Sequence, residues 1–209
     1  MERKEKIGGL RSVRANLTGA RDNLDISERH LEILEVAASL FAERGYAATS
    51  VREIGAKVGL LGGSLYHYIK SKEALFVQVH EMALRVSEDQ ILAAIARTNN
   101  PWERLEVACV TMLEIRLDPE SLTMPLMNDF SSVPPETRQR LIVRRDEFEL
   151  IFRNLIADLP LSPVVDRSLY RLLLLTLLNN VGSWYRKGAM SPAEIAIQIV
   201  TIFRSGGNG

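Results

Sequence analysis

Residues 49–72 read TSVREIGAKVGLLGGSLYHYIKSK, and this stretch carries the strongest fold signal in the chain. Ser50, followed three residues later by Glu53, forms a capping box, in which the two residues satisfy each other's backbone amides at a helix start. Gly59 is expected to stop that helix after about two turns. A second short helix is expected from about residue 62 to residue 69. Two short helices joined by such a turn make a helix-turn-helix, the unit whose second helix enters the major groove of DNA.

The two faces of the predicted second helix differ in character. Leu60, Leu65 and Ile69 lie near the spacing needed to pack inward. The remaining positions form the outer and flanking face: Gly62, Gly63, Ser64, Tyr66, His67 and Tyr68. Hydroxyl and imidazole groups on this face can form hydrogen bonds, and Lys70 and Lys72 can meet phosphates. The glycines weaken the helix but let its backbone approach another surface closely.

Helical periodicity also precedes this stretch. Apolar residues recur at i, i+3, i+4 and i+7 from Leu31 to Phe41, which predicts an amphipathic helix. Asp25 or Ser27 can cap its start, and Gly45 fits a C-terminal stop.

The block from Ser27 to Phe76 resembles the DNA-binding domain of TetR-family transcriptional regulators. The resemblance runs without a gap through LFAERGYAATS, TSVREIGAKVG and SLYHYIKSKEALF. It implies an all-α fold, with an N-terminal three-helix helix-turn-helix domain and a C-terminal helical domain for ligand binding and dimerisation. The expected DNA-binding domain covers residues 27–87, with its motif at about 50–69. The ligand-binding and dimerisation domain is expected over residues 88–204.

The resemblance also implies roles for individual residues. Positions that match DNA-contacting residues of the family are Ser50, Val51, Arg52, Gly62, Gly63, Ser64, Tyr66, His67, Tyr68 and Lys72. Ser71 would cap the next helix, so that its positive N-terminal end points at the DNA backbone. Many members carry Lys or Gln where this chain has Gly62. That departure implies less direct base readout and more weight on Ser64, Tyr66, thymine-methyl contacts and DNA shape.

The segment upstream of this domain is strongly charged, and the segment downstream is expected to be the regulatory part. Residues 1–21 hold six basic and two acidic residues, a net charge of +4. We expect a disordered basic arm over residues 1–24, which is either merely solvated or touches phosphates or a minor groove.

Downstream, a long helix from Lys72 to about Arg97 would connect the DNA-binding domain to the C-terminal domain. The break at residues 99–101 ends it.

Further helices are predicted at 102–117 and 136–159, separated by an apolar, Met-rich segment at 121–130 that Pro125 interrupts. We interpret that segment either as core packing or as a short kinked helix beside a cavity. The helix at 136–159 carries four arginines in eight residues: Arg138, Arg140, Arg144 and Arg145. They either pair with nearby acidic residues on a solvated face or hold the phosphates of a coenzyme-A-type ligand.

The last two predicted helices, 164–187 and 193–203, are apolar nearly all round. A helix without a polar face must be covered on both sides, and a second copy of the chain is the expected cover. The resemblance implies the same homodimer through the two C-terminal helices. Residues 181–200 also resemble the C-terminal region of a subgroup that includes repressors of steroid and fatty-acid catabolism, several of which sense acyl-CoA thioesters.

These features predict a repressor that leaves a palindromic, double-stranded DNA operator when a small hydrophobic effector binds. An acyl-CoA or another lipid or aromatic catabolite is the candidate effector. Residues expected to line its site are Met112, Ile115, Met127, Phe130, Phe148, Phe152, Leu177 and Trp184. A TetR-like activator and a non-enzymatic helical adaptor or scaffold are the alternatives.

The composition bounds the remaining possibilities. Of 209 residues, 46% are hydrophobic and 25% charged, which fits a folded globular protein with zero formal net charge. The longest apolar run, 172–178, is far shorter than the roughly 20 residues that span a bilayer. With no signal-peptide pattern at the N-terminus, a cytoplasmic, nucleoid-associated protein is expected. Cys109, the single cysteine, is expected to be buried and inert.

No enzyme motif emerges from the sequence. A helical di-metal site would need Glu-x-x-His spacings on facing helices, and none of the three histidines has Glu three residues before it. Phosphate-binding loops and nucleophile elbows are absent as well. We therefore expect no catalysis, no metal site and no cofactor.

Overall fold

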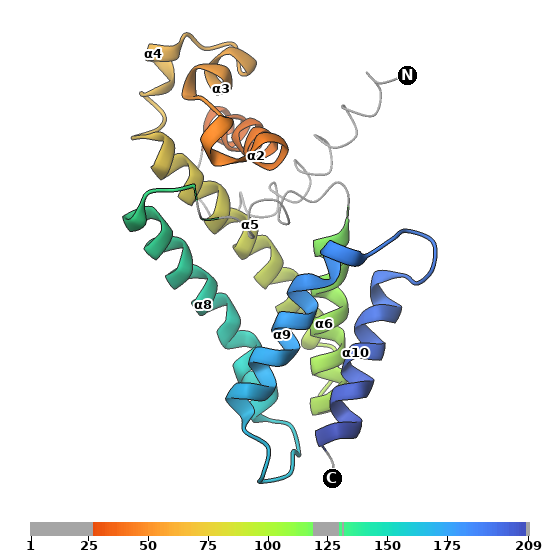
Figure 1. Ribbon diagram of the computed structural model, residues 1–209. Helices are drawn as coiled ribbons and strands as arrows, with labels where there is room; N and C mark the ends of the chain where they lie inside the picture. Colours follow the sequence, from red (N-terminus) through yellow and green to blue (C-terminus); the bar gives the residue numbers. More distant parts are fainter. Residues whose placement is uncertain (1–26, 119–129, 131, 208–209) are drawn as a thin grey trace. The chain divides into compact units, whose positions relative to one another are not determined.

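The computed structural model describes residues 27–118, 130 and 132–207 (Figure 1). Within them the chain forms eight helices and no strand, which confirms the predicted all-α fold. The helices are α2 (Glu28–Ala48), α3 (Val51–Lys57), α4 (Gly62–Leu65), α5 (Lys72–Ile95), α6 (Pro101–Leu117), α8 (Pro135–Ala157), α9 (Arg167–Trp184) and α10 (Pro192–Gly207).

The chain divides into two compact units. The first comprises Met1–Val86 and Pro119–Arg145, and the second comprises Ser87–Asp118 and Asp146–Gly209. The helices α5 and α8 therefore each contribute residues to both units. The functional division expected near residue 87 stays a prediction.

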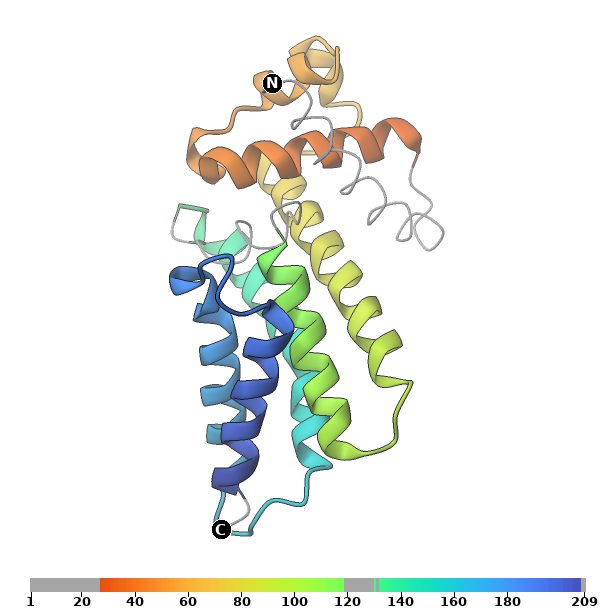
Figure 2. The same cartoon turned by 90° about the vertical axis from the view of Figure 1, so that its right-hand side faces the viewer.

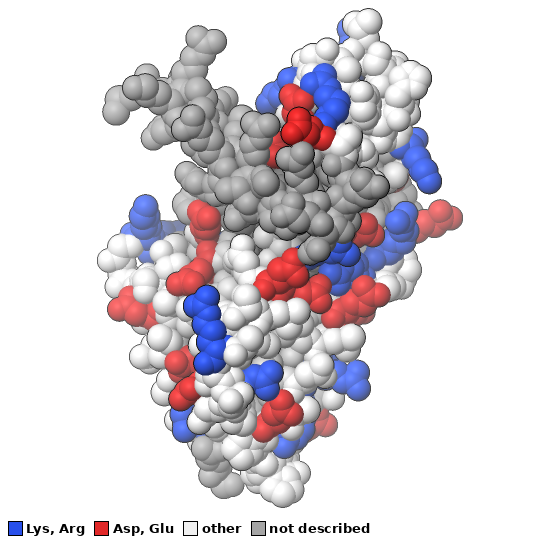
Figure 3. Space-filling model, turned by 180° about the vertical axis from the view of Figure 1, so that it is seen from behind, with Lys and Arg blue, Asp and Glu red and all other residues white. Residues whose placement is uncertain are grey.

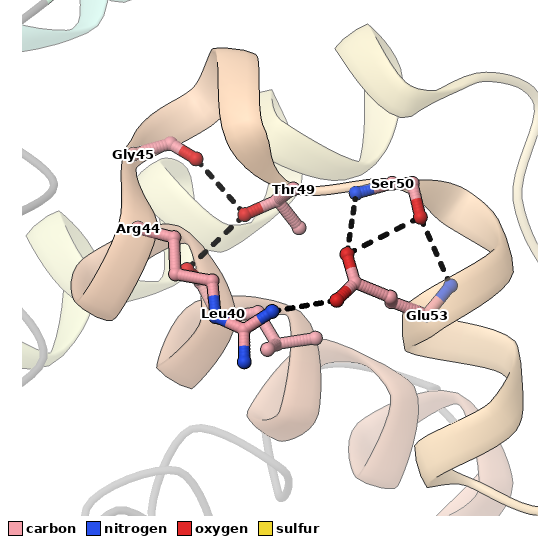
Figure 4. A network of polar contacts seen from close by, with 6 residues as sticks. All are labelled: Leu40, Arg44, Gly45, Thr49, Ser50 and Glu53. Carbon is pink, nitrogen blue, oxygen red and sulfur yellow. Dashed lines mark hydrogen bonds and ion pairs between the residues drawn. The ribbon is translucent and has the colours of Figure 1, made fainter.

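Helix α2 begins as its sequence predicts, whereas the predicted stop at Gly45 is a break inside the helix, which ends at Ala48. The Ser27 hydroxyl accepts a hydrogen bond from the His30 amide at 3.3 Å, which caps the start. Gly45 leaves the helical path with φ 77° and ψ 169°, a left-handed conformation that glycine adopts at little cost. The Thr49 hydroxyl lies 3.1 Å from the Leu40 carbonyl oxygen and 2.9 Å from that of Gly45, so it bridges the two sides of the break (Figure 4).

One apolar core holds the first unit together. It takes buried side chains from α2, α3, α4, α5 and the start of α8, among them Leu34, Ile54, Leu65, Leu75 and Leu141. Three aromatic rings form its centre. Phe41 and Tyr46 each lie 4.9 Å from the Phe76 ring, centroid to centroid, in edge-to-face geometry.

The second unit is a helical bundle in which α6, α9 and α10 lie side by side (Figures 1 and 2). The side-chain oxygen of Asn100 caps α6 by accepting from the amides of Trp102 and Glu103, at 3.0 and 3.2 Å. Arg167, at the start of α9, donates to the carbonyls of Ile156 and Leu159 and so ties α9 to the end of α8.

Several predicted boundaries were wrong, among them the end of α9, which is Trp184 rather than residue 187. Helix α4 stops at Leu65 rather than Ile69, because the residues that follow form tighter turns: the His67 amide donates to the Ser64 carbonyl and the Tyr68 amide to the Leu65 carbonyl, three residues back. Helix α9 begins at Arg167 rather than residue 164, because the Asp166 carboxylate accepts from the Leu169 amide at 2.8 Å and starts the helix there. Helix α10 runs on to Gly207 rather than ending at Phe203.

The basic arm, and the Met-rich segment apart from Phe130, lie outside the described residues. Among the helices that the structure does describe, none combines the length and apolar character needed to cross a membrane.

Candidate nucleic-acid interface

The start of α3 presents the first group of predicted contact residues. Ser50 and Arg52 are exposed, whereas Val51 is half-buried and packs against the apolar core. The predicted capping box is present: the Ser50 hydroxyl accepts from the Glu53 amide at 3.1 Å, and the Glu53 carboxylate accepts from the Ser50 amide at 3.3 Å (Figure 4). Because the capping box occupies the amides of Ser50 and Glu53, only the amides of Val51 and Arg52 between them are open to an anion at this helix start.

Glu53 joins this helix start to α2. Its second carboxylate oxygen lies 2.5 Å from Nη1 of Arg44, which comes from the end of α2 (Figure 4). The Ser50 amide and hydroxyl and the Arg44 charge lower the pKa of Glu53, with the bond from the Ser50 amide as the largest cause. The carboxylate therefore stays ionised and keeps the entrance to α3 rigid.

A second tie fixes the end of α3. Arg29 of α2 donates to the carbonyl of Val58, the residue that ends α3, and pairs with Glu32 at 2.6 Å. Gly59 follows with φ 69°, the left-handed turn that its sequence predicts. The Leu60 amide then bonds back to the Gly55 carbonyl at 2.8 Å. The turn between α3 and α4 is thus held from both α2 and α3.

Helix α4 and the turn after it carry the predicted groove-facing residues. Leu65 and Ile69 are 0% and 4% exposed, so they anchor the segment in the core as predicted. Tyr66 is 57% exposed, and His67 and Tyr68 also reach the surface. These three residues lie in the turn after α4 instead of in a helix. Gly62, Gly63 and Ser64 form α4 itself.

Leu61 was missed by the sequence interpretation. This residue precedes α4 and is 83% exposed, an unusual position for a large apolar side chain. Its signal in the sequence was the doubled leucine of Leu60-Leu61, because only one of two neighbours can pack inward.

Lys72, the last predicted contact, begins α5. Ser71 caps this helix by accepting from the Ala74 amide at 3.1 Å, which confirms the predicted cap. The Lys72 ammonium lies 4.1 Å from the centroid of the Tyr46 ring, and the neighbouring Glu73 carboxylate accepts from the Tyr46 hydroxyl at 2.5 Å. The sequence interpretation assigned no role to Tyr46 or Glu73.

The charge on the face shown in Figure 3 is mixed. Lysine and arginine side chains alternate there with aspartate and glutamate, as the zero formal net charge suggests. The described residues on this face therefore form no broad basic surface.

The predicted effector residues fall in different places. Met112, Phe148 and Phe152 are buried and Ile115 is half-buried in the second unit, where the Phe148 and Phe152 rings lie 6.3 Å apart. Phe130 belongs to the first unit, 5.4 Å from the His80 ring. Met127 lies outside the described residues.

Leu177 and Trp184 lie on the surface of α9. A pocket of about 320 Å³ opens at the α9–α10 turn, with Trp184, Met190 and Ile202 among its lining residues. Of the predicted effector residues, Trp184 alone borders this pocket. In the described residues no group of three or more His, Cys, Asp or Glu could hold a metal ion.

Comparison with known proteins identifies the family. The sequence profile described as "Bacterial regulatory proteins, tetR family" matches residues 33–79, and the profile "Tetracyclin repressor-like, C-terminal domain" matches residues 98–206. The chain belongs to the TetR family. The resemblance seen in the sequence is thereby confirmed, and the helix-turn-helix built by α3 and α4 is the DNA-binding motif of a TetR-family regulator.

Two curated relatives extend the match. The HTH-type transcriptional repressor KstR2 of Mycolicibacterium smegmatis is 30% identical to this TetR-family chain over 189 residues, which cover 86% of the chain and 91% of the relative. KstR2 of Mycobacterium tuberculosis is 45% identical over 85 residues, which cover 39% of the chain and 40% of that repressor's length.

Solved structures share the fold. AibR in complex with isovaleryl coenzyme A and operator DNA matches with a TM-score of 0.72 at 25% identity, covering 84% of this chain and 97% of AibR. The ketosteroid transcriptional regulator KstR2 of M. tuberculosis matches with a TM-score of 0.65 at 25% identity, covering 88% and 97%. The predicted likeness to lipid-catabolism regulators is thus confirmed.

Proposed function

We propose that this TetR-family protein is a ligand-responsive transcriptional repressor, without enzymatic activity, that binds a palindromic operator as a homodimer in the cytoplasm. The observation that carries the proposal is the surface of the helix-turn-helix. Tyr66, His67 and Tyr68 are exposed side by side, while Leu65 and Ile69 on either side of them are buried. The buried residues hold this segment in place, and the exposed polar and aromatic side chains are suited to contact base edges in a major groove.

The start of α3 and the start of α5 would supply the contacts to the DNA backbone. Arg52 is exposed beside a capped helix start, and Lys72 lies at the start of α5. Cations and backbone amides at these positions would bind phosphates and fix the protein on the duplex. Ser64, Tyr66 and His67 would then read the bases, with Gly62 and Gly63 allowing close approach of the backbone.

The second copy would cover the apolar faces of α9 and α10. Leu172, Leu173 and Leu177 are each about half exposed on α9, and Ile202 of α10 is 67% exposed. Leaving so many large apolar side chains in water is unfavourable, by roughly 25 cal/mol per Å². A two-fold four-helix interface would bury them and place two helix-turn-helix motifs on one operator.

The effector we propose is an acyl-CoA thioester or a related lipid catabolite. This class is suggested by AibR, which was solved with isovaleryl coenzyme A, and by KstR2, a ketosteroid regulator. In the second unit, the buried apolar side chains of Met112, Phe148 and Phe152 would line the site for an acyl chain. Binding there would favour a conformation in which the two motifs no longer fit the operator together.

Footprinting on the promoters of the protein's own gene and its neighbours, at about 150 mM salt, tests the proposal. We expect protection of a palindromic site that is lost in a Tyr66→Ala, His67→Ala variant of unchanged thermal stability. An acyl-CoA panel is then added to the bound complex, with free coenzyme A as the control. An active effector should lower operator affinity by about 5- to 150-fold. Absence of any sequence-specific protection would refute the function.

A further inference from the structure

We infer that Tyr46 is a positioning residue for DNA binding: it holds the Lys72 ammonium over its ring and draws the Glu73 carboxylate away from that ammonium. Lys72 then meets a DNA phosphate without an ion pair to the carboxylate next to it in the chain. The inference rests on the proposed operator binding and adds to it a residue outside the helix-turn-helix.

The Tyr46 ring is held in place by neighbouring side chains. Tyr46 directly follows the break at Gly45 and is 8% exposed. Its ring stacks on Phe41 at 6.1 Å and meets the edge of Phe76 at 4.9 Å. With neighbours on several sides the ring has little freedom to rotate, so groups bound to it are fixed relative to the core.

The Lys72 ammonium lies over the face of the Tyr46 ring. Its Nζ is 4.1 Å from the ring centroid, within the range of a cation–π interaction. A free lysine loses about 2 kcal/mol of side-chain entropy when it is ordered. Because Lys72 is already half-buried against the ring, much of that loss has occurred before DNA arrives. Burial lowers the pKa of Lys72, and the nearby Glu73 charge opposes that shift.

Glu73 is the group most able to compete with DNA for this ammonium, since it follows Lys72 in the chain. In the structure its Oε1 accepts the Tyr46 hydroxyl proton at 2.5 Å instead. This hydrogen bond is the largest cause of the lowered pKa of Glu73. Burial and the same bond raise the pKa of Tyr46, so the hydroxyl remains a donor. Among the described residues, no ion pair joins Lys72 to Glu73.

The consequence is electrostatic. A carboxylate that paired with Lys72 would cancel its attraction for a phosphate and would itself repel the phosphate. The tyrosine hydroxyl removes that competitor while the tyrosine ring keeps the ammonium in place. A phenylalanine at position 46 would keep the ring and lose the hydroxyl. Glu73 would then be held only by its own backbone amide and the Ser71 hydroxyl, and its carboxylate could turn toward Lys72.

Three variants of the full chain test this: Tyr46→Phe, Glu73→Gln and the double variant. Affinity is measured by fluorescence anisotropy on a promoter duplex that the wild type protects, between 50 and 300 mM salt. Tyr46→Phe should weaken binding about 3- to 10-fold, because Glu73 would then compete with the phosphate for Lys72; the size is comparable to the net contribution of one hydrogen bond. The double variant should restore affinity to within about 2-fold of wild type, because glutamine carries no charge to compete.

A Lys72→Met background supplies the matched control. This variant alone should reduce the slope of log affinity against log salt by about 0.9 per protomer. Adding Tyr46→Phe to it should then have no further effect. An unchanged affinity in Tyr46→Phe overturns the inference. So does a loss that Glu73→Gln does not restore, or one that persists with Lys72→Met, since either means that Tyr46 acts through the fold. A wild-type protein without specific binding refutes the proposed function itself.

Discussion

Two neighbouring residues in the DNA-binding motif differ in burial, and so one serves folding and the other is available for binding. Leu65 ends α4 with no exposed surface, and Tyr66 follows it with more than half of its surface in solvent. One side chain therefore contributes free energy to folding, whereas the other is available for binding. The contrast allows fold and function to be separated by single substitutions at adjacent positions.

At this scale we predict that Leu65→Ala lowers the free energy of unfolding by about 2–5 kcal/mol, because it opens a cavity in the core of the first unit. Tyr66→Ala should leave the unfolding free energy within about 0.5 kcal/mol of wild type and weaken operator binding about 10-fold or more. Urea denaturation and anisotropy titrations measure the two quantities. If Tyr66→Ala were the more destabilising change, Tyr66 would be a structural residue.

Among helices, the same capping device recurs at two places. Ser50 and Glu53 start α3, and Ser191 and Glu194 start α10 with the same reciprocal bonds, at 3.2 Å to the Glu194 amide and 2.7 Å to its carboxylate. Glu53 is half-buried and Glu194 is exposed, and the bond from the serine amide is the largest cause of the lowered pKa of each. The Ser50–Glu53 capping box lies at the proposed DNA contact, whereas the Ser191–Glu194 box does not.

We therefore predict that Ser50→Ala and Ser191→Ala each cost about 1 kcal/mol of stability, while Ser50→Ala alone impairs operator binding. Thermal melts and DNA titrations of the two variants, run in parallel, measure this. Equal loss of DNA affinity in both would mean that the effect of Ser50 is indirect.

The pKa shifts of Glu53 and Glu194 predict the pH response of the helix starts. A carboxyl pKa that is lower in the folded state stabilises the protein above the ordinary value of 4.5 and ceases to do so as the pH falls through the lowered pKa. The melting temperature should therefore drop on acidification below about pH 4.5. The Glu53→Gln, Glu194→Gln variant should melt lower at pH 7 and lose less on acidification. A parallel fall in both proteins would assign the acid sensitivity to other groups.

In the folded chain, some large apolar side chains remain exposed to solvent. In the second unit, α9 buries Leu174, Leu175 and Leu178 but exposes Leu173 and Leu177 on its other side. The sequence predicted that this helix is apolar nearly all round and therefore needs packing partners on both sides. The fold supplies one cover from within the chain, and the proposed second copy supplies the other.

We predict that Leu173→Glu converts the dimer to a monomer and abolishes cooperative operator binding, because two buried carboxylates would face each other across a two-fold interface. Leu150→Glu, at a similarly exposed leucine of α8, should remain dimeric. Sedimentation velocity at micromolar concentration distinguishes the two. A Leu173→Glu dimer would place the interface elsewhere.

Sequence alone determined the features that depend on neighbours along the chain. The capping box at Ser50, the stop at Gly59 and the inward packing of Leu65 follow from local hydrogen bonding, backbone sterics and periodicity, and all three are present. The family and the all-α fold could be predicted for the same reason, since the decisive motif is contiguous. Only the tertiary structure placed the Tyr46 ring under Lys72 and the Tyr46 hydroxyl against Glu73. These residues lie far apart in the chain, and their contact depends on how α2 and α5 pack, which no local pattern encodes.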